Sequence, residues 1–466
     1  MKLPRIMFAA QGSGSGKTLI TCGILQALID RGLNPVSFKC GPDYIDPMFH
    51  QRVIGNTSKN LDPFFTGEEM TKYLFADGAQ KGDISVLEGV MGYYDGIAGI
   101  STRASSYHLA GITDTPVILI VNTKGMSLSA LPVIKGFLEY RSDSRIKGIL
   151  LNQMSEHMYP QMKEKIEKEL HVKVLGYVPK VEHFTIESRH LGLVTPNEIT
   201  MLKEKLKQLA AILEKTLQLD EMIEIAQGAK LLEWTEPKIE KVIPDHQTIT
   251  IGIAKDDAFC FIYRDNLELL QKMGAKLKFF SPLTDYEIPK DLDGLIFYGG
   301  YPELHAEKLS KNTAMLKSIQ NADRQGMPYL AECGGFMYLH SVMEDLNGQE
   351  YQMADLIKGR AYYTGKLKRF GYVTLTAKQD QVLCSAGEQI NAHEFHYYDS
   401  TSNGDGFTAE KPLSGRKWEC MHGSDCFAAG FPHLYYYGNP EFAGNFLKAC
   451  AGWQKEGKNN DSGNNR

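Results

Sequence analysis

The sequence predicts an α/β protein built from two doubly wound domains. Two series of short, nearly continuous Val, Ile and Leu runs alternate with helical patterns, which is typical of parallel sheets covered on both faces. A Glu- and Lys-rich segment separates the two series. Near the N-terminus, a glycine-rich loop joins the first expected strand to the first expected helix. The chain of 466 residues is long enough to form two or three cores.

The first series covers residues 1–195 and forms the predicted N-terminal domain. Its apolar runs read as strands because they are short and are bounded by helical patterns. The expected strands are 5–10, 35–39, 83–89, 116–122, 146–154 and 173–179. The expected helices that lie between several of them are 17–31, 129–139 and 159–170.

The second series begins after a charged helical extension and linker at 196–247 and forms a predicted domain at 248–453. Its expected strands are 248–254, 275–282, 293–300 and 328–333, with helices near 264–273 and 312–325. From about residue 350 the chain carries Gly- and Tyr-rich strand candidates. The polar tail at 454–466 is expected to be disordered.

Composition argues against several classes of protein. The formal net charge is −5, from 51 basic and 56 acidic residues, which disfavours a nucleic-acid partner. The apolar run at 117–121 is too short to span a membrane, and no signal peptide precedes the first strand, so a cytoplasmic location is expected. The eight cysteines form no CxxC pair, which argues against a disulfide framework or a zinc site. A homodimer stays open.

The loop "AAQGSGSGKT" at 9–18 resembles a phosphate-binding loop in which Gln11 replaces the first glycine. Such a loop wraps an anion with backbone N–H groups at the positive end of a helix. Gly14 and Gly16 keep the loop free of Cβ atoms, Lys17 is expected to reach the phosphates, and Thr18 is expected to hold Mg²⁺. The cofactor expected here is therefore ATP with Mg²⁺.

Carboxylates follow several expected strands, at the edge of a parallel sheet where ligands bind. Glu88 ends the strand at 83–89, Asp43 and Asp46 follow the second strand, and Asp95 lies in "YYDG". Each could instead be a solvated loop acid or a helix cap, but together they favour a shared metal site. Asn152 ends another strand and is a candidate for reading an adenine edge.

Cys333 lies between an apolar strand and an apolar helix and is followed by two glycines. A sharp turn of this kind presents a nucleophile at a helix N-terminus, where a lowered thiol pKa is expected. The backbone N–H groups of Gly334 and Gly300 are the candidate oxyanion donors, and His433 is the candidate base. The role of His393 and His396 stays open, because their spacing does not match HExxH and no third ligand is evident.

Seven stretches together resemble the glutamine-dependent cobyrinic acid a,c-diamide synthases of cobalamin biosynthesis, in that family's order. They are "FKCGPDYIDPMFH" (38–50), "NLDPFF" (60–65), "LEGVMGYYDG" (87–96), "SRHLGL" (188–193), "GGYPELHAE" (299–307), "AECGGFMYL" (331–339) and "HEFHYY" (393–398). The first and fifth stretches are the most specific. The phosphate loop alone would indicate only nucleotide binding.

The resemblance implies an N-terminal ATP-dependent amide ligase domain, related to dethiobiotin synthetases, and a C-terminal domain like the class I glutamine amidotransferases. It implies that Cys333 forms a γ-glutamyl thioester and releases ammonia from glutamine. MgATP would phosphorylate the a and c acetate carboxylates of a corrinoid tetrapyrrole in turn, and ammonia would displace the phosphate.

The same resemblance assigns roles to the candidate residues. Lys17 and Thr18 fall in the ATP loop, and the metal ligands would be Thr18, Asp46 and Glu88. Asp43, Asp46 and Asp95 would serve the reacting carboxylate. His433 matches the histidine that activates the thiol. Triad glutaminases carry Glu two residues after this histidine, whereas this chain has Tyr435, so a Cys–His dyad is expected.

Other functions stay open at this point. A sister enzyme would amidate hydrogenobyrinic acid or nickel-sirohydrochlorin, and the sequence does not fix the central metal. Cobyric acid synthase has similar halves but is disfavoured by the stretches at 41–50 and 299–307. A P-loop regulatory ATPase with an inert glutaminase-like module would lack the nucleophile that Cys333 supplies.

Overall fold

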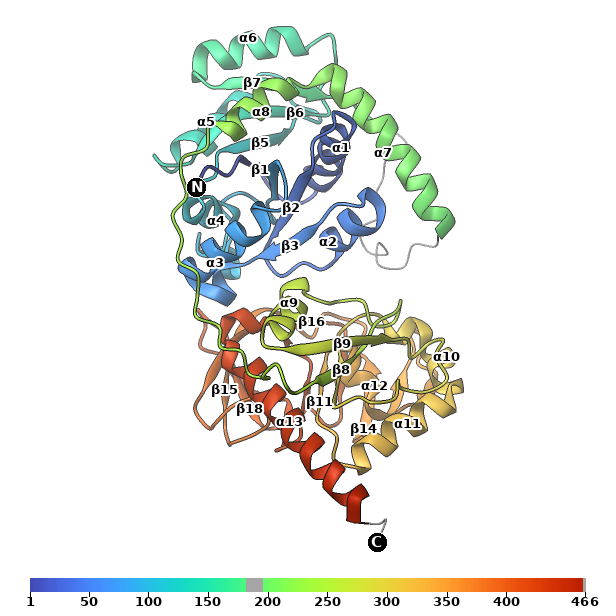
Figure 1. The fold of residues 1–466 in the computed structure, drawn as a ribbon. Coiled ribbons are helices and arrows are strands. Elements are labelled where there is room, and N and C mark those ends of the chain that lie inside the picture. Colours follow the sequence, from blue (N-terminus) through green and yellow to red (C-terminus); the bar gives the residue numbers. More distant parts are fainter. Residues whose placement is uncertain (182–195, 464–466) are drawn as a thin grey trace. The chain divides into compact units, whose positions relative to one another are not determined.

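The computed structural model describes residues 1–181 and 196–463, so the family-like stretch at 188–193 lies outside the described residues. The chain divides into two compact units, Met1–Pro237 and Lys238–Arg466 (Figure 1). The segment 196–247, expected to be a helical extension and linker, therefore contributes residues to both units.

The N-terminal unit is built on a seven-stranded sheet of order β3-β2-β4-β1-β5-β6-β7, in which every neighbouring pair is parallel. The strands are β1 (Arg5–Ala10), β2 (Pro35–Cys40), β3 (Ser58–Leu61), β4 (Ile84–Glu88), β5 (Val117–Asn122), β6 (Ile146–Asn152) and β7 (Lys173–Val178). Nearly all strand residues are buried, as the apolar runs predicted. Sequence analysis missed β3, because "SKNL" has no apolar pattern.

Helices connect these strands and cover the sheet (Figure 1). They are α1 (Lys17–Asp30), α2 (Ile45–Phe49), α3 (Pro63–Ala79), α4 (Ser106–Ile112), α5 (Ala130–Glu139), α6 (Tyr159–Leu170), α7 (Pro196–Thr216) and α8 (Leu219–Gln227). The last two helices lie within 196–227, and α7 packs along α1. A shared core joins α1, α7, α8 and the sheet, so the charged segment after the sheet is part of this unit.

The C-terminal unit contains a six-stranded sheet of order β20-β21-β11-β10-β8-β9, parallel except for the pair β20 and β21. Its strands are β8 (Ile249–Ala254), β9 (Ala275–Phe280), β10 (Gly294–Phe297), β11 (Tyr329–Glu332), β20 (His422–Gly423) and β21 (Phe427–Gly430). Its helices are α9 (Arg264–Lys272), α10 (Ala306–Lys311), α11 (Thr313–Arg324), α12 (Gly334–Tyr338) and α13 (Pro440–Gly463).

Two further sheets complete this unit. One has the order β13-β12-β14-β17, and the other has the order β19-β18-β15-β16-β22. Their strands are β12 (His340–Glu344), β13 (Glu350–Gln352), β14 (Ile357–Tyr363), β15 (Arg369–Ala377), β16 (Gln389–His396), β17 (Tyr398–Ser400), β18 (Phe407–Glu410), β19 (Lys417–Cys420) and β22 (His433–Leu434). The Gly- and Tyr-rich region after residue 350 thus forms strands, and the α/β fold class is confirmed in both units.

Helix α13 corrects one expectation. It continues to Gly463, through residues that sequence analysis placed in a disordered tail, and its first half is anchored by the buried Phe442, Phe446 and Cys450. No helix in the described part of the chain is long and apolar enough to cross a membrane.

Candidate active sites

The phosphate loop lies between β1 and α1, where the sequence predicted it. Gly14 and Gly16 have φ angles of +74° and +86°, in the left-handed region that favours glycine. A Cβ atom on Gly16 would lie 2.5 Å from the side-chain nitrogen of Asn152. Gln11 does not have a positive φ, so the backbone does not require glycine there. The missing glycine of the motif therefore leaves the loop geometry intact.

Lys17 is buried at the first position of α1, and its Nζ donates a hydrogen bond of 2.5 Å to the carbonyl of Met91. Burial, followed by the nearby charge of Lys39, lowers the pKa of Lys17 to about 8. The backbone N–H of Gly92 in turn donates to Asp95 at 2.8 Å. Asp95 thus supports the segment whose carbonyl holds Lys17.

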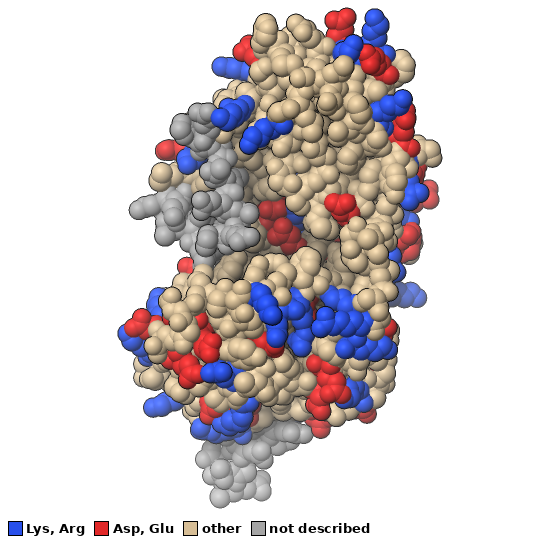
Figure 2. Space-filling model, turned by 180° about the vertical axis from the view of Figure 1, so that it is seen from behind, with Lys and Arg blue, Asp and Glu red and all other residues tan. Residues whose placement is uncertain are grey.

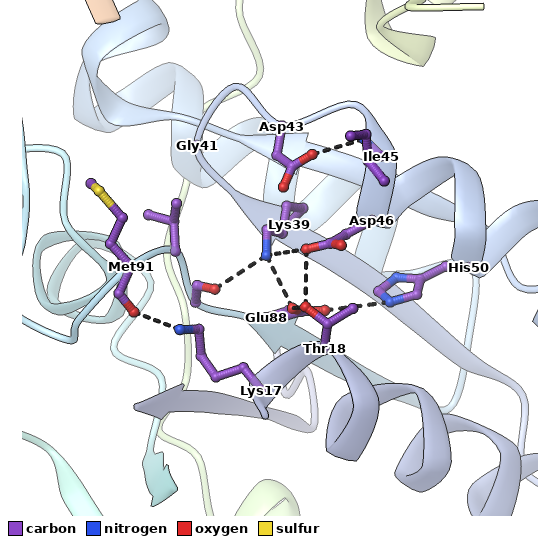
Figure 3. A network of polar contacts seen from close by, with 12 residues as sticks. Lys17, Thr18, Lys39, Gly41, Asp43, Ile45, Asp46, His50, Glu88 and Met91 are labelled. Carbon is purple, nitrogen blue, oxygen red and sulfur yellow. Dashed lines mark hydrogen bonds and ion pairs between the residues drawn. The ribbon is translucent and has the colours of Figure 1, made fainter. Parts of the chain in front are cut away.

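A buried network of acids and bases lies beside this loop (Figure 3). The Thr18 hydroxyl donates to Glu88 Oε1 at 2.7 Å and lies 3.4 Å from Asp46 Oδ2. Lys39 Nζ lies 3.0 Å from the same Glu88 oxygen and forms an ion pair with Asp46. His50 Nε2 lies 3.4 Å from Glu88 Oε2. The structure therefore brings together Thr18, Asp46 and Glu88, the three predicted metal ligands.

The two carboxylates of this network have opposite pKa shifts. Burial, and then the charge of Glu88, raises the pKa of Asp46 well above its usual value. Burial would also raise the pKa of Glu88, but the charge of Lys39 and hydrogen bonds from His50 and Thr18 hold it below its usual value. Glu88 is thus ionised and Asp46 holds its proton readily, as expected for two acids that share a small site.

The donor set fits Mg²⁺. The hydroxyl of Thr18 and the carboxylates of Asp46 and Glu88 are hard oxygen ligands, and Mg²⁺ commonly takes one or two carboxylates together with substrate phosphates and water. Among the described residues, no group of three or more His, Cys, Asp and Glu side chains could hold a metal ion. When bound, the ion would neutralise charge on the phosphates.

Two further predicted residues serve the local structure. Asp43 Oδ1 accepts a hydrogen bond of 2.8 Å from the backbone N–H of Ile45, at the start of α2 (Figure 3). The Asn152 amide donates to the carbonyl of Ser15 at 2.8 Å and accepts from the N–H of Gln153 at 2.9 Å. Both ends of the Asn152 amide are thus used within the protein, and the residue braces the phosphate loop.

Sequence analysis missed Lys39 and His50. Both lie within "FKCGPDYIDPMFH", and both are buried. The available signal was a lysine inside a strand expected to be covered on both faces, because lysine is almost never fully buried unless it is paired. The partners of Lys39 come from α2 and β4 and could not be read from local spacing.

In the C-terminal unit, Cys333 forms a strained turn between β11 and α12. Its φ and ψ are 47° and −107°, unusual for a residue with a side chain, and such strain is often found at functional sites. A Cβ atom on Gly335 would lie 2.1 Å from the carbonyl oxygen of Phe297. A Cβ atom on Gly334 would lie 3.0 Å from the nitrogen of Gly300. The two predicted oxyanion donors, Gly300 and Gly334, are therefore neighbours beside the cysteine.

The pKa of Cys333 differs from the sequence-based expectation. Burial raises this pKa, and the Glu303 carboxylate raises it further, against the opposing effect of the Gly334 N–H. The helix that follows is only five residues long, Gly334–Tyr338, so its dipole does not overcome the loss of hydration. In the ligand-free protein the group is a thiol, and proton removal during reaction requires a base.

His433 is placed to be that base. A Cβ atom on Gly299 would lie 2.6 Å from His433 Cε1 and 3.4 Å from Cys333 Cβ, so the imidazole and the cysteine flank the same point. The ring is buried, and burial, followed by the charge of His396, lowers the pKa of His433 to about 3. The imidazole is therefore neutral and can accept a proton at neutral pH.

The residue two positions after His433 points away from it, because the Tyr435 hydroxyl donates to Asp265 Oδ2 at 2.7 Å. A different acid contacts the imidazole. Glu332, the residue before the nucleophile, places its Oε2 atom 3.8 Å from His433 Nδ1. Sequence analysis missed Glu332 because a side chain adjacent to Cys333 should point to the opposite face of a regular strand.

The two histidines whose role stayed open lie on β16. His393 pairs with His433 across the β16–β22 ladder. His396 stacks on Phe431 with ring centroids 4.0 Å apart, and its Nδ1 lies 2.6 Å from the Tyr398 carbonyl. These contacts anchor His396 in the protein interior.

Comparisons with known proteins identify the family of each unit. Residues 6–194 match the CobQ/CobB/MinD/ParA nucleotide-binding domain, and residues 250–427 match the CobB/CobQ-like glutamine amidotransferase domain. The cobyrinate a,c-diamide synthase of Caldanaerobacter subterraneus subsp. tengcongensis is 38% identical, over 97% of this chain and 99% of that protein. Those of Clostridium acetobutylicum and Priestia megaterium are 38% and 36% identical, over 94% and 97% of this chain and 98% of each relative. The chain belongs to the cobyrinate a,c-diamide synthase family and is a glutamine-dependent amidotransferase ligase.

Proposed function

We propose that this protein amidates the a and c acetate carboxylates of cobyrinic acid, with glutamine as the nitrogen source and ATP as the activating substrate. The observation that carries the proposal is the presence in one chain of two separate sites. One is a phosphate loop beside an acid–lysine network, and the other is a strained cysteine beside a neutral histidine. The family relationship supports the choice of substrate.

In the N-terminal unit, the γ-phosphoryl group of ATP transfers to a substrate carboxylate, and ADP leaves. Lys17 and the loop N–H groups would hold the triphosphate, and Thr18, Asp46 and Glu88 would hold Mg²⁺. Lys39 supplies positive charge next to these carboxylates. Ammonia then attacks the acyl phosphate, the C–O bond to phosphate breaks, and an amide forms. The two amidations consume two ATP and two ammonia molecules.

In the C-terminal unit, the sulfur of Cys333 attacks the side-chain amide carbon of glutamine. The thiol proton passes to His433 and then to the departing ammonia, which leaves a γ-glutamyl thioester. The N–H groups of Gly300 and Gly334 stabilise the oxyanion. Water then hydrolyses the thioester and releases glutamate.

Cationic side chains cluster around one aromatic ring of the C-terminal unit. Lys and Arg side chains gather on part of this unit's surface (Figure 2). The charged groups of Arg369, Lys411 and Arg416 lie 5.4, 5.8 and 5.9 Å from the centre of the Trp418 ring. The π-system of the Trp418 ring attracts cations at such distances.

The test of substrate identity is a direct comparison of three tetrapyrroles, each in a separate incubation. The protein is incubated with ATP, Mg²⁺ and glutamine and with cobyrinic acid, hydrogenobyrinic acid or nickel-sirohydrochlorin. Mass spectrometry is expected to show two amides on cobyrinic acid. Amidation of only one of the other two would transfer the proposal to that substrate, and no amide on any of them would contradict it.

The separation of the two sites is tested with Cys333→Ala. We expect this variant to lose glutamine-supported amidation and to keep amidation with high ammonium, because the N-terminal site needs only ammonia. Cys384→Ala, which removes another buried cysteine of the same unit, serves as the matched control and should keep both activities. Loss of both activities in a folded Cys333→Ala protein would contradict two separate sites.

A further inference from the structure

We propose that Glu332 is the positioning residue for His433, and so completes a catalytic triad from the position before the nucleophile. The inference rests on the proposed glutaminase reaction at Cys333. It replaces the Cys–His dyad that the sequence predicts with a Cys–His–Glu arrangement. The acid comes from β11 instead of from the segment after the histidine.

The contact is made by two buried side chains. Glu332 Oε2 lies 3.8 Å from His433 Nδ1, and each side chain is only 3% exposed. This separation is longer than a hydrogen bond, as catalytic contacts often are before substrate binds. A carboxyl group at this distance needs only a small movement to accept the Nδ1 proton.

The backbone at Cys333 explains how two consecutive side chains reach one imidazole. In a regular strand, Glu332 and Cys333 would point to opposite faces of the sheet. The positive φ of 47° at Cys333 breaks this alternation at the end of β11. The strain at the nucleophile therefore also brings the preceding carboxyl group to the other side of His433.

The neighbouring acids have other partners. Asp265 accepts the Tyr435 hydroxyl at 2.7 Å. Glu394 lies 3.7 Å from Nε2 of His396, and His396 is held by Phe431 and by the Tyr398 carbonyl. Glu332 lies beside His433, with its Oε2 atom 3.8 Å from Nδ1.

The protonation states define what Glu332 does. Burial raises the pKa of Glu332 well above its usual value, and the backbone N–H of Leu434 opposes this rise. At rest the thiol, the imidazole and the carboxyl group are all neutral. Reaction needs a proton on His433 Nδ1, facing an ionised Glu332, so that Nε2 is free to take the thiol proton. Glutaminase activity should therefore fall at low pH as Glu332 becomes protonated, and this fall is the acid limb of the pH profile.

Several other titratable groups lie near this pair and influence its protonation. They are Cys333 between β11 and α12, Tyr298 next to β10, Tyr436 at the start of the turn Tyr436–Gly438, Glu303 in the turn Pro302–His305, and His393, Glu394 and His396 on β16. Burial raises the pKa values of Tyr298 and Tyr436, so neither hydroxyl ionises at neutral pH. The histidines on β16 do not contact Glu332.

The test compares Glu332→Gln with the wild-type protein in glutamine hydrolysis from pH 5.5 to 9.5. We expect Glu332→Gln to lower kcat by about 100-fold or more, since loss of the orienting acid leaves the wrong imidazole tautomer. The KM for glutamine should change little, and the acid limb should disappear. Glu332→Asp, which keeps the carboxylate, should restore part of kcat and an acid limb.

Asp265→Asn is the matched control, because it removes another buried carboxylate of the same unit that does not contact His433. It should keep the wild-type kcat and pH profile. A wild-type kcat or an unchanged acid limb in Glu332→Gln would overturn the inference, as would equal losses in Glu332→Gln and Asp265→Asn. If circular dichroism shows that Glu332→Gln is unfolded, Glu332→Asp becomes the deciding variant. A kcat and a pH profile of glutamine hydrolysis identical to those of the wild type in Glu332→Asp would then overturn the inference.

The outcomes for this inference and for the proposed function are distinct. A wild-type protein that hydrolyses no glutamine contradicts the proposed function. A wild-type protein that hydrolyses glutamine with the same pH profile as Glu332→Gln contradicts only the role of Glu332.

Discussion

At the scale of single residues, Lys17 gives the N-terminal site a measurable pH dependence. Its pKa is lowered to about 8, chiefly by burial. A bound triphosphate favours the charged ammonium and so raises this pKa. We therefore expect ATP binding to take up close to one proton at pH 9 and almost none at pH 6.5. Calorimetric titration in two buffers of different ionisation enthalpy measures this uptake directly.

Lys17→Arg is the control, because a guanidinium stays protonated across this range. The proton exchange left in this variant comes from ATP and other groups, so the wild-type uptake minus that of Lys17→Arg should rise with pH, and a difference that is independent of pH would contradict the shifted lysine. The same shift affects stability without nucleotide. Between pH 8 and the usual value of 10.5, the unfolded chain holds a proton that folded Lys17 has lost, so stability from this group rises with pH.

At the scale of elements, α7 shows why a charged helix belongs to a core. Leu206, Leu209 and Leu213 recur on one face and are buried, whereas Lys203, Glu204, Lys207 and Gln208 face solvent. Gly23 of α1 lets the two helices approach, because a Cβ there would lie 2.6 Å from Leu213 and 2.9 Å from Leu209. The contact is thus specified by small and large residues on facing helices.

We expect the double variant Leu209→Ala and Leu213→Ala to destabilise the N-terminal unit by about 2–5 kcal/mol for each leucine. Differential scanning calorimetry checks this, since ATP should raise the temperature of the transition that belongs to this unit. Lys207→Ala, on the exposed face of α7, should change stability by less than about 0.5 kcal/mol. Equal effects of the two changes would show that α7 does not pack on α1 in solution.

At the scale of the whole molecule, the two units have separate cores and should fold separately. We expect a piece comprising residues 1–237 to be monomeric and folded, and a piece comprising 1–195 to aggregate. The shorter piece lacks α7 and α8 and so exposes the apolar face of α1. Circular dichroism and size-exclusion chromatography of the two pieces measure the difference. A folded, monomeric 1–195 piece would contradict this view of the N-terminal unit.

The sequence was sufficient where the signal is local. Strand–loop–helix order, apolar runs and the glycines of the phosphate loop predicted the parallel sheet and the position of Lys17 and Thr18. Local patterns also predicted Cys333 with its two glycines, because a strained turn needs them at fixed spacing. Strand β3 was not predicted, because its four buried residues, Ser58–Leu61, include polar side chains that are paired only in the folded unit.

Tertiary structure decided everything that depends on residues far apart in the chain. Lys39 reaches Glu88 across 49 positions, and Asn152 braces Ser15 across 137. Burial reversed the expected pKa shift of Cys333, and the strand order of the folded unit placed Glu332 beside His433. By itself the sequence determined the fold class and the family resemblance and predicted Cys333 as the nucleophile, because these follow from local pattern. The charge states and the partners of the catalytic groups depend on burial and on three-dimensional proximity, which only the folded chain determines.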